Sequence, residues 1–224
     1  MDSDQYMLQQ ADKNIKKYLE NNDMLDKHDK LKCFNDMRSC VSNAHFVIEA
    51  IPEKIDAKKE LFQELDKICS PNVILASNTS GIPISLLVEN CNNKERIVGT
   101  HFFTPALAVP IVEVIKSKYV NDEIIFITVE LLKKINKIPL VVHKDIPGFI
   151  GNRLQHALQR EANSLLEKEV ATAKDIDLAV KYIFGARFPH TGILEQRDLS
   201  GVDTNFYVAE YLYESLEDCK SPLK

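Results

Sequence analysis

The stretch that decides the fold is residues 46–80, FVIEAIPEKIDAKKELFQELDKICSPNVILASNTS. It opens with an apolar, β-branched and aromatic run at 46–51, which predicts a buried strand that Pro52 ends. Residues 57–69 then place apolar side chains on one face of a helix, and residues 73–76 form a second apolar strand. Strand, helix and strand in this order predict a βαβ unit with parallel strands.

The same alternation continues along the chain. Residues 96–103 and 138–143 predict two further strands, with an extended segment around Glu113 and a helix at 124–135 between them. An amphipathic helix is also expected at 5–20, ahead of the deciding stretch. Functional groups of such a sheet belong at the carboxyl ends of its strands.

A helical region follows the α/β region. Apolar residues recur at helical spacing in three segments: 152–168, 172–185 and 205–216. Because no strand signal is strong there, we place a domain boundary near Pro147. We therefore expect an α/β domain over residues 1–145 and an all-helical domain over residues 146–224. Residues 185–195 are interpreted as an irregular loop that enters another helix.

Composition limits the function classes. The 224 residues carry a net charge of -5, from 28 basic and 33 acidic side chains without a basic block, which gives nucleic-acid binding no electrostatic support. The five cysteines are odd in number and form no CxxC pair, so neither a disulfide framework nor a metal site is expected. No apolar run could span a membrane and the first residues are no secretory signal, so we expect a cytoplasmic protein.

The sharpest candidate for chemistry is His101, in the run His101-Phe-Phe-Thr-Pro105, with Glu113 twelve residues later. Histidine is the natural general base near neutral pH, and a carboxylate can fix its tautomer and stabilise its protonated form. A histidine at a strand end is, however, more often structural, and two residues at this spacing need not touch. Spacing alone leaves both interpretations open.

Two other segments place small polar side chains at the ends of predicted elements. Ser77 to Ser80 follow the strand at 73–76 and could bind a substrate oxygen or a cofactor amide, or could cap the next helix. Residues 145–153 form a turn that opens a helix. Asn152 could hold a carbonyl or hydroxyl oxygen there, or could belong to a plain linker.

Seven segments, in order and at near-family spacing, resemble the 3-hydroxyacyl-CoA dehydrogenase family: VIEAIPEKIDAKKELFQELD, SNTS, HFFTP, PIVEVI, DIPGFIGNR, AKDIDLAV and GILEQRDLSGVD. The resemblance covers essentially the whole chain. It implies an α/β fold class, with an incomplete Rossmann-type parallel sheet domain followed by an all-helical C-terminal domain. Residues 1–145 would form a partial NAD-binding domain, and residues 146–224 a partial helical domain for substrate binding and dimerisation.

The resemblance also implies an activity, the NAD-dependent oxidation of a 3-hydroxyacyl-CoA to a 3-ketoacyl-CoA. His101 matches the family's catalytic base, which takes the proton from the 3-hydroxyl while hydride leaves that carbon for the nicotinamide. Glu113 matches the acidic partner that orients this histidine. Ser80 and Asn152 match the residues that hold the reacting oxygen.

The implied cofactor is NAD. The matching cofactor-binding positions are Asp2, Ala50, Glu53, Lys58, Asn78, Ser80 and Thr104. Glu53 and Lys58 match contacts near the nicotinamide ribose. Asp2 falls where the family has the acid that binds the adenosine ribose hydroxyls, which implies NAD over NADP because a 2'-phosphate would be repelled. Thr104 stands where the family usually has asparagine, so a nicotinamide contact is expected to weaken or change.

The chain departs from the family at both ends. It contains no GxGxxG turn to bind the pyrophosphate, and it stops at Lys224, before the last helices of the family's dimerising domain. We expect part of a dehydrogenase that acts on a small-molecule acyl-CoA and is a homodimer at full length. A truncated, catalytically inactive homologue is one alternative. Residues 185–195 lean toward the lambda-crystallin and L-gulonate 3-dehydrogenase branch, which makes a sugar acid the alternative substrate.

Overall fold

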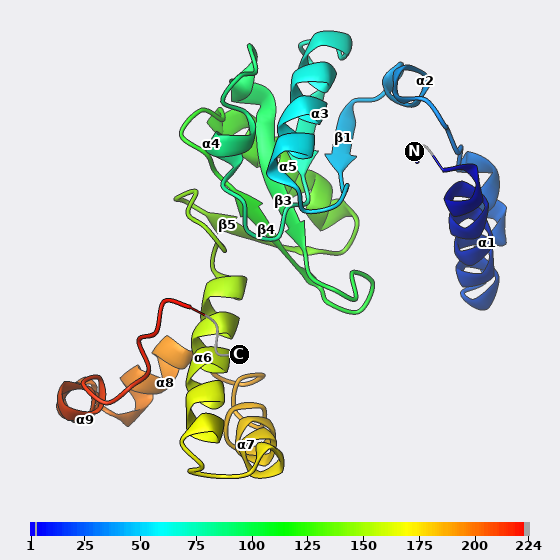
Figure 1. Ribbon diagram of the computed structural model, residues 1–224. Coiled ribbons are helices and arrows are strands. Elements are labelled where there is room, and N and C mark those ends of the chain that lie inside the picture. The colour runs from blue at the N-terminus through cyan, green and yellow to red at the C-terminus, as the bar shows by residue number, and fades with distance from the viewer. Residues whose placement is uncertain (3, 222–224) are drawn as a thin grey trace. The chain divides into compact units, whose positions relative to one another are not determined.

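The computed structural model describes residues 1–2 and 4–221 (Figure 1). The chain divides into two compact units, Met1–Ile150 and Gly151–Lys224. The first holds a five-stranded sheet with its helices, and the second is helical over its described residues. The expected fold class, a Rossmann-type α/β domain followed by a helical domain, is confirmed.

The sheet has its five strands in sequence order: β1 (Phe46–Glu49), β2 (Ile74–Ser77), β3 (Ile97–Phe102), β4 (Ile111–Ile115) and β5 (Ile138–Val142). Neighbouring strands are parallel except β3 and β4, which are antiparallel. The sequence predicted a parallel sheet and gave no direction to the segment around Glu113, and this pair is the antiparallel one. Residues 103–110 join the two strands directly, and they are too few for the crossover of a dozen or more residues that parallel neighbours need.

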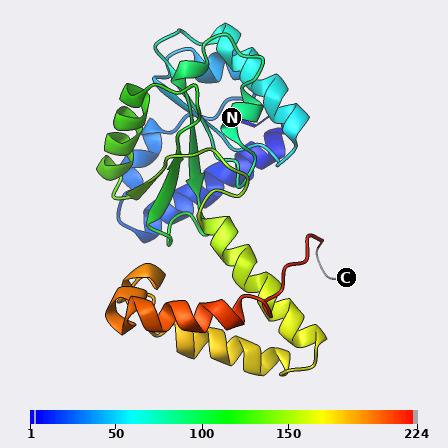
Figure 2. The ribbon, with the colours of Figure 1, turned by 90° about the vertical axis from the view of Figure 1, so that its left-hand side faces the viewer.

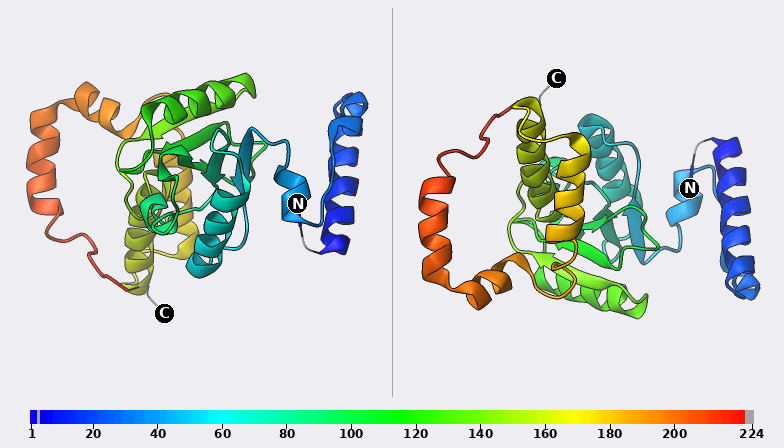
Figure 3. Two further views of the ribbon diagram at one scale, coloured as in Figure 1. Left: turned by 90° about the horizontal axis from the view of Figure 1, so that it is seen from above. Right: turned by 90° about the horizontal axis from the view of Figure 1, so that it is seen from below.

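The helical elements of this unit are α1 (Gln5–Asn21), η1 (Leu25–Lys30), α2 (Met37–Val41), α3 (Ile55–Ile68), α4 (Ile84–Leu87), η2 (Lys94–Arg96) and α5 (Asp122–Lys134). Seen from above in Figure 3, the strands lie between α3 and α5. On β2, Leu75 packs into the cluster with α3 and α4, whereas Ile74 and Ala76 pack into a second cluster with α5. Because β2, β3 and β4 are almost entirely buried, their sequences do not alternate regularly between apolar and polar residues.

The helical unit contains α6 (Gly151–Glu167), α7 (Ala173–Ala179), the π-helical turn η3 (Val180–Phe184), α8 (Ile193–Ser200) and α9 (Val202–Leu212) (Figure 2). Residues 185–192 form an irregular segment, and the helix that it enters, α8, begins at Ile193. The Glu195 carboxylate accepts a hydrogen bond of 2.7 Å from the Gly192 amide just before this helix. The spacing of Gly192 and Glu195 is a local signal for the start of a helix, but the apolar face of α8 is too weak for periodicity to predict this helix.

Candidate active site

The two strands that hold the catalytic candidates are paired in register. His101 on β3 lies directly opposite Glu113 on β4. Nδ1 of His101 is 2.8 Å from Oε2 of Glu113, and the side chains are 5% and 0% exposed. A carboxylate accepts hydrogen bonds, so this contact fixes the tautomer with hydrogen on Nδ1. Nε2 is then the ring nitrogen that can take a proton from another molecule.

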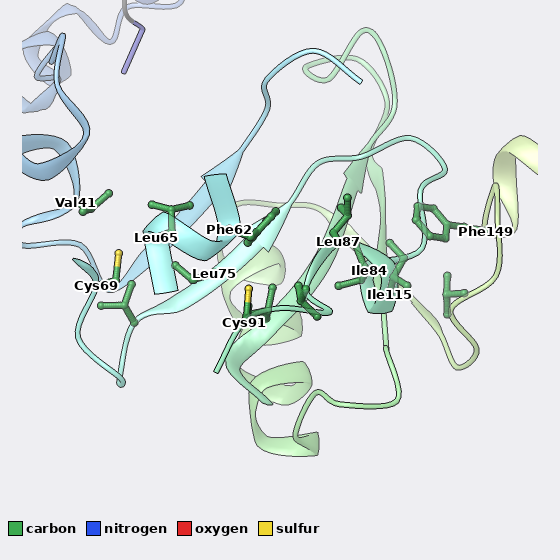
Figure 4. Close-up of a cluster of buried hydrophobic side chains, with 14 residues drawn as sticks. Val41, Phe62, Leu65, Cys69, Leu75, Ile84, Leu87, Cys91, Ile115 and Phe149 are labelled. Atoms are coloured by element: carbon green, nitrogen blue, oxygen red, sulfur yellow. The ribbon is translucent and has the colours of Figure 1, made fainter. Parts of the chain in front are cut away.

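Aromatic rings surround the imidazole. The ring centroid of Phe103 lies 4.4 Å from that of His101, and the centroid of Phe149 lies 6.0 Å away. Phe149 is fully buried, and Figure 4 shows it at one end of the labelled core cluster. A low-dielectric surrounding strengthens the attraction between the carboxylate and the imidazolium that forms when His101 is protonated.

A second polar centre lies after β1 and β2. Oε1 of Glu53 accepts a hydrogen bond of 2.6 Å from the Thr79 hydroxyl and one of 2.9 Å from the Ser80 amide. Its other carboxylate oxygen is 3.3 Å from Nζ of Lys58. Burial acts to raise the pKa of Glu53, but the Thr79 hydroxyl and the Lys58 ammonium outweigh it and hold the pKa below its ordinary value. Glu53 is therefore a fixed, ionised acceptor whose side chain is 43% exposed.

Beneath Glu53 the predicted residue Lys58 lies in a buried ionic cluster with Glu49, which is not among the predicted site residues. Nζ of Lys58 donates to Oε1 of Glu49 at 2.6 Å and to the Ile51 carbonyl at 3.1 Å. The other Glu49 oxygen accepts from the Ser77 hydroxyl at 2.6 Å. The available signal was a carboxylate inside an apolar strand, because a buried charge requires a partner.

The segment after β2 does not cap the next helix, because the first two amides of α4 donate to Asp145, and its role in binding a substrate or cofactor stays a prediction. Oγ1 of Thr79 accepts from the Ile82 amide at 3.0 Å, which is a contact within the turn that leads to α4. The Asn78 side-chain oxygen accepts from the amide of Phe102 at 2.9 Å and so links the ends of β2 and β3. These contacts order the turn after β2, and the Thr79 hydroxyl and the Ser80 amide of the same segment hold the Glu53 carboxylate.

The remaining candidates lie in other segments of the chain. Ala50 is exposed just after β1, and Thr104 is exposed before a cis peptide bond to Pro105. Asp2 lies before α1, where its carboxylate accepts from the Asp4 amide at 2.9 Å. Asn152 lies in the first turn of α6 and belongs to the helical unit. Its role remains a prediction.

Among residues 1–2 and 4–221, no group of three or more histidine, cysteine, aspartate or glutamate side chains is placed to hold a metal ion. No helix in that same part of the chain is long and apolar enough to cross a membrane.

Comparison with known proteins identifies the family. Residues 1–146 match the family described as 3-hydroxyacyl-CoA dehydrogenase, NAD binding domain. Residues 148–223 match its C-terminal domain. The chain belongs to the 3-hydroxyacyl-CoA dehydrogenase family. The predicted family and the predicted cofactor, NAD, are confirmed.

Individual relatives differ in the substrates that they are named for. The human mitochondrial hydroxyacyl-coenzyme A dehydrogenase is 37% identical over 84% of this chain and 58% of its own length. A 5-formyl-3-hydroxy-2-methylpyridine 4-carboxylate 5-dehydrogenase of Mesorhizobium japonicum is 34% identical over 82% of this chain and 60% of its own. The solved 3-hydroxybutyryl-CoA dehydrogenase of Escherichia coli is 32% identical over 95% of this chain and 46% of that chain, with a TM-score of 0.77.

The chain is shorter than these relatives. Its matches span 58% and 60% of the length of the two curated relatives. The activity and the substrate of the whole protein are therefore matters for a proposal.

Proposed function

We propose that this chain carries the proton-transfer site of an NAD-dependent 3-hydroxyacyl-CoA dehydrogenase. The observation that supports this most is the buried pair of His101 and Glu113, whose contact of 2.8 Å leaves Nε2 to act as the base. NAD, when bound, accepts a hydride from the carbon that carries the hydroxyl group. Nε2 of His101 takes the hydroxyl proton, and Glu113 stabilises the imidazolium that results. Ser80 and Asn152 hold the reacting oxygen.

The residues after β1 and β2 fit the nicotinamide-ribose half of NAD. Glu53 is an ionised acceptor for ribose hydroxyls, held in place by Thr79, Ser80 and Lys58. Ala50 is small and exposed, so a ribose could approach the backbone there. We assign the other cofactor contacts to Asn78, Ser80 and Thr104, and the adenosine ribose to Asp2. Residues 1–145 then form the partial NAD-binding domain and residues 146–224 the partial helical domain.

The test measures both binding and turnover by the 224-residue chain. Calorimetry with NADH should give micromolar binding, and NADH oxidation should follow addition of acetoacetyl-CoA. His101→Gln should lower kcat by about 10²–10⁴-fold, the usual worth of general acid–base catalysis. His45→Gln is the matched control, because His45 is exposed and precedes β1 at the other end of the sheet. A chain that neither binds NADH nor turns over would instead be an inactive homologue.

Substrate choice needs a separate comparison. We propose an acyl-CoA because the HFF and DIPGFIGNR segments favour that branch, and because the human relative is named for it. Turnover of L-gulonate, and not of 3-hydroxybutyryl-CoA, would assign the enzyme to the sugar-acid branch.

We also propose that the helical unit forms a homodimer interface with a second copy of the chain. Ser164 is the one buried side chain among residues 151–221, whereas Phe206, Tyr207 and Tyr211 of α9 are each more than 60% exposed. Exposed apolar surface of this extent is typical of protein interfaces. Light scattering should give a dimer, and Tyr211→Glu should give a monomer. A wild-type monomer at micromolar concentration would exclude this interface.

A further inference from the structure

The segment between β5 and α6, residues 145–150, is fastened to the α/β unit at several separate points. At its start, the Asp145 carboxylate accepts hydrogen bonds from the Ile84 amide at 2.9 Å and from the Ser85 amide at 2.6 Å. These are the first two amides of α4, which have no partner inside the helix. One carboxylate thus anchors the segment to a helix that packs into the core.

In its middle the segment lies against the turn after β2. The Gly148 amide donates to the Gly81 carbonyl at 3.0 Å. A Cβ atom on Gly81 would lie 3.3 Å from Cα of Gly148, so the two backbones are nearly in contact. Gly148 and Phe149 both have left-handed backbones, with φ of 76° and 50°. A phenylalanine rarely adopts this conformation, so the surrounding contacts must hold it there.

The last two residues of the segment reach the catalytic pair. The Phe149 ring is fully buried in the same cluster as Ile84 and Ile115, 6.0 Å from the His101 ring by centroids. The Ile150 amide donates to Oε1 of Glu113 at 2.9 Å. Glu113 therefore uses one oxygen for the segment and the other for Nδ1 of His101.

We propose that residues 145–150 are a positioning element for the catalytic pair. The anchored segment presents the Ile150 amide to one oxygen of Glu113, which fixes the carboxylate so that its other oxygen meets Nδ1. The Phe149 ring closes the space beside the imidazole. Asp145 and Phe149 act through Glu113 and His101 and are positioning residues, not catalytic ones. This proposal rests on the proposed function, in which His101 is the base, but its test reads the tautomer of His101 and does not require enzymatic turnover.

The test reads the tautomer of His101 by NMR of the full chain labelled with ¹⁵N-histidine. The chain has six histidines, and His101→Gln identifies the signals of His101. At about pH 8, where free imidazole is neutral, wild type should show one tautomer with hydrogen on Nδ1 and well-separated signals for the two ring nitrogens. Asp145→Ala and Phe149→Leu should each bring the two signals closer together, because the fixed tautomer is lost.

Matched controls separate positioning from general loss of stability. Asp36→Ala removes another helix cap in the same unit, where the Asp36 carboxylate accepts from the Ser39 amide at 2.8 Å. Phe62→Leu trims another fully buried phenylalanine of the same cluster. Both controls should keep the wild-type signals. The proposal is overturned if Asp145→Ala and Phe149→Leu keep them too, or if the controls shift as far. Lack of turnover by the wild type would count against the proposed function alone.

Discussion

Changing Glu49 to glutamine keeps the shape of a buried side chain and removes its charge. The Lys58 ammonium would then remain in the core, where its side chain is 1% exposed. Removing one partner of a buried ion pair costs about 3–5 kcal/mol. Two contacts of Lys58 survive the change, the Ile51 carbonyl at 3.1 Å and the half-exposed Glu53 at 3.3 Å. We therefore expect the free energy of unfolding to fall by about 3 kcal/mol, at the lower end of that range.

A double-mutant cycle separates the pair from its surroundings. Lys58→Met should also destabilise, because it leaves the Glu49 carboxylate with only neutral donors such as the Ser77 hydroxyl among the contacts described above. The double variant should be more stable than either single variant, since an apolar replacement of a buried pair is often close to neutral. Urea unfolding followed by circular dichroism gives the three free energies, and their non-additivity gives the coupling.

The neighbouring residue on α3 is the control. Lys59 pairs with Glu89 at 3.4 Å, and their side chains are 23% and 60% exposed. Lys59→Met should cost less than about 1 kcal/mol, as exposed pairs do. The reasoning fails if Glu49→Gln costs no more than Lys59→Met, or if the two changes at positions 49 and 58 are simply additive.

Three further predictions follow from the surroundings of single ionisable groups. Burial acts to raise the pKa of Asp66, but hydrogen bonds from side-chain and backbone donors lower it below its ordinary 3.8. The stability that the Asp66 carboxylate contributes is therefore present above pH 3.8 and is lost as pH falls through the lower pKa of the folded state. Asp66→Asn should flatten the acid limb of a plot of stability in urea against pH. Burial raises the pKa of the Cys91 thiol from 9.0 to about 11, so the free energy of unfolding should fall as pH rises between these two values. Near pH 8, a thiol reagent should modify the exposed Cys33 and spare Cys91 until the chain unfolds. The hydrogen bond from the Ser164 hydroxyl is the largest of the causes that lower the pKa of Glu217 to about 2. Ser164→Ala should therefore raise that pKa in a carboxyl ¹³C NMR titration, and an unchanged titration would contradict the contact.

Local periodicity predicted the elements that bury a regular face. The strand and helix pattern predicted at 46–80 is confirmed. Each of these elements buries apolar side chains, so the spacing of apolar residues within the element itself shows its type. The sequence left the direction of β4 open, since strand direction depends on connection length rather than on the strand's own residues. Residues 37–41 form α2, a helix too short to show a period.

The residues of the site could be predicted from the sequence only in part. The family motifs selected His101 and Glu113, but their contact follows from the antiparallel register of β3 and β4, which no spacing could show. Glu49 is not among the predicted site residues, because its position inside an apolar strand indicates a buried charge but not the partner of that charge. Its burial depends on Lys58, nine residues along the chain and on the next helix, reaching back to it.

The buried charges of the α/β unit lie at both ends of the sheet, and they differ in what they can do. Before β3, Asp66 pairs with Arg96 at 2.9 Å and accepts from the amides of Asn92 and Asn93, so its charge is used entirely to join the end of α3 to the neighbouring loops. After β1, Lys58 instead joins a buried carboxylate to the exposed one of Glu53. A buried ion pair stabilises a fold weakly compared with apolar packing. The pair of Glu49 and Lys58 is therefore better explained by the exposed carboxylate that it holds ionised and in place than by the core that it occupies.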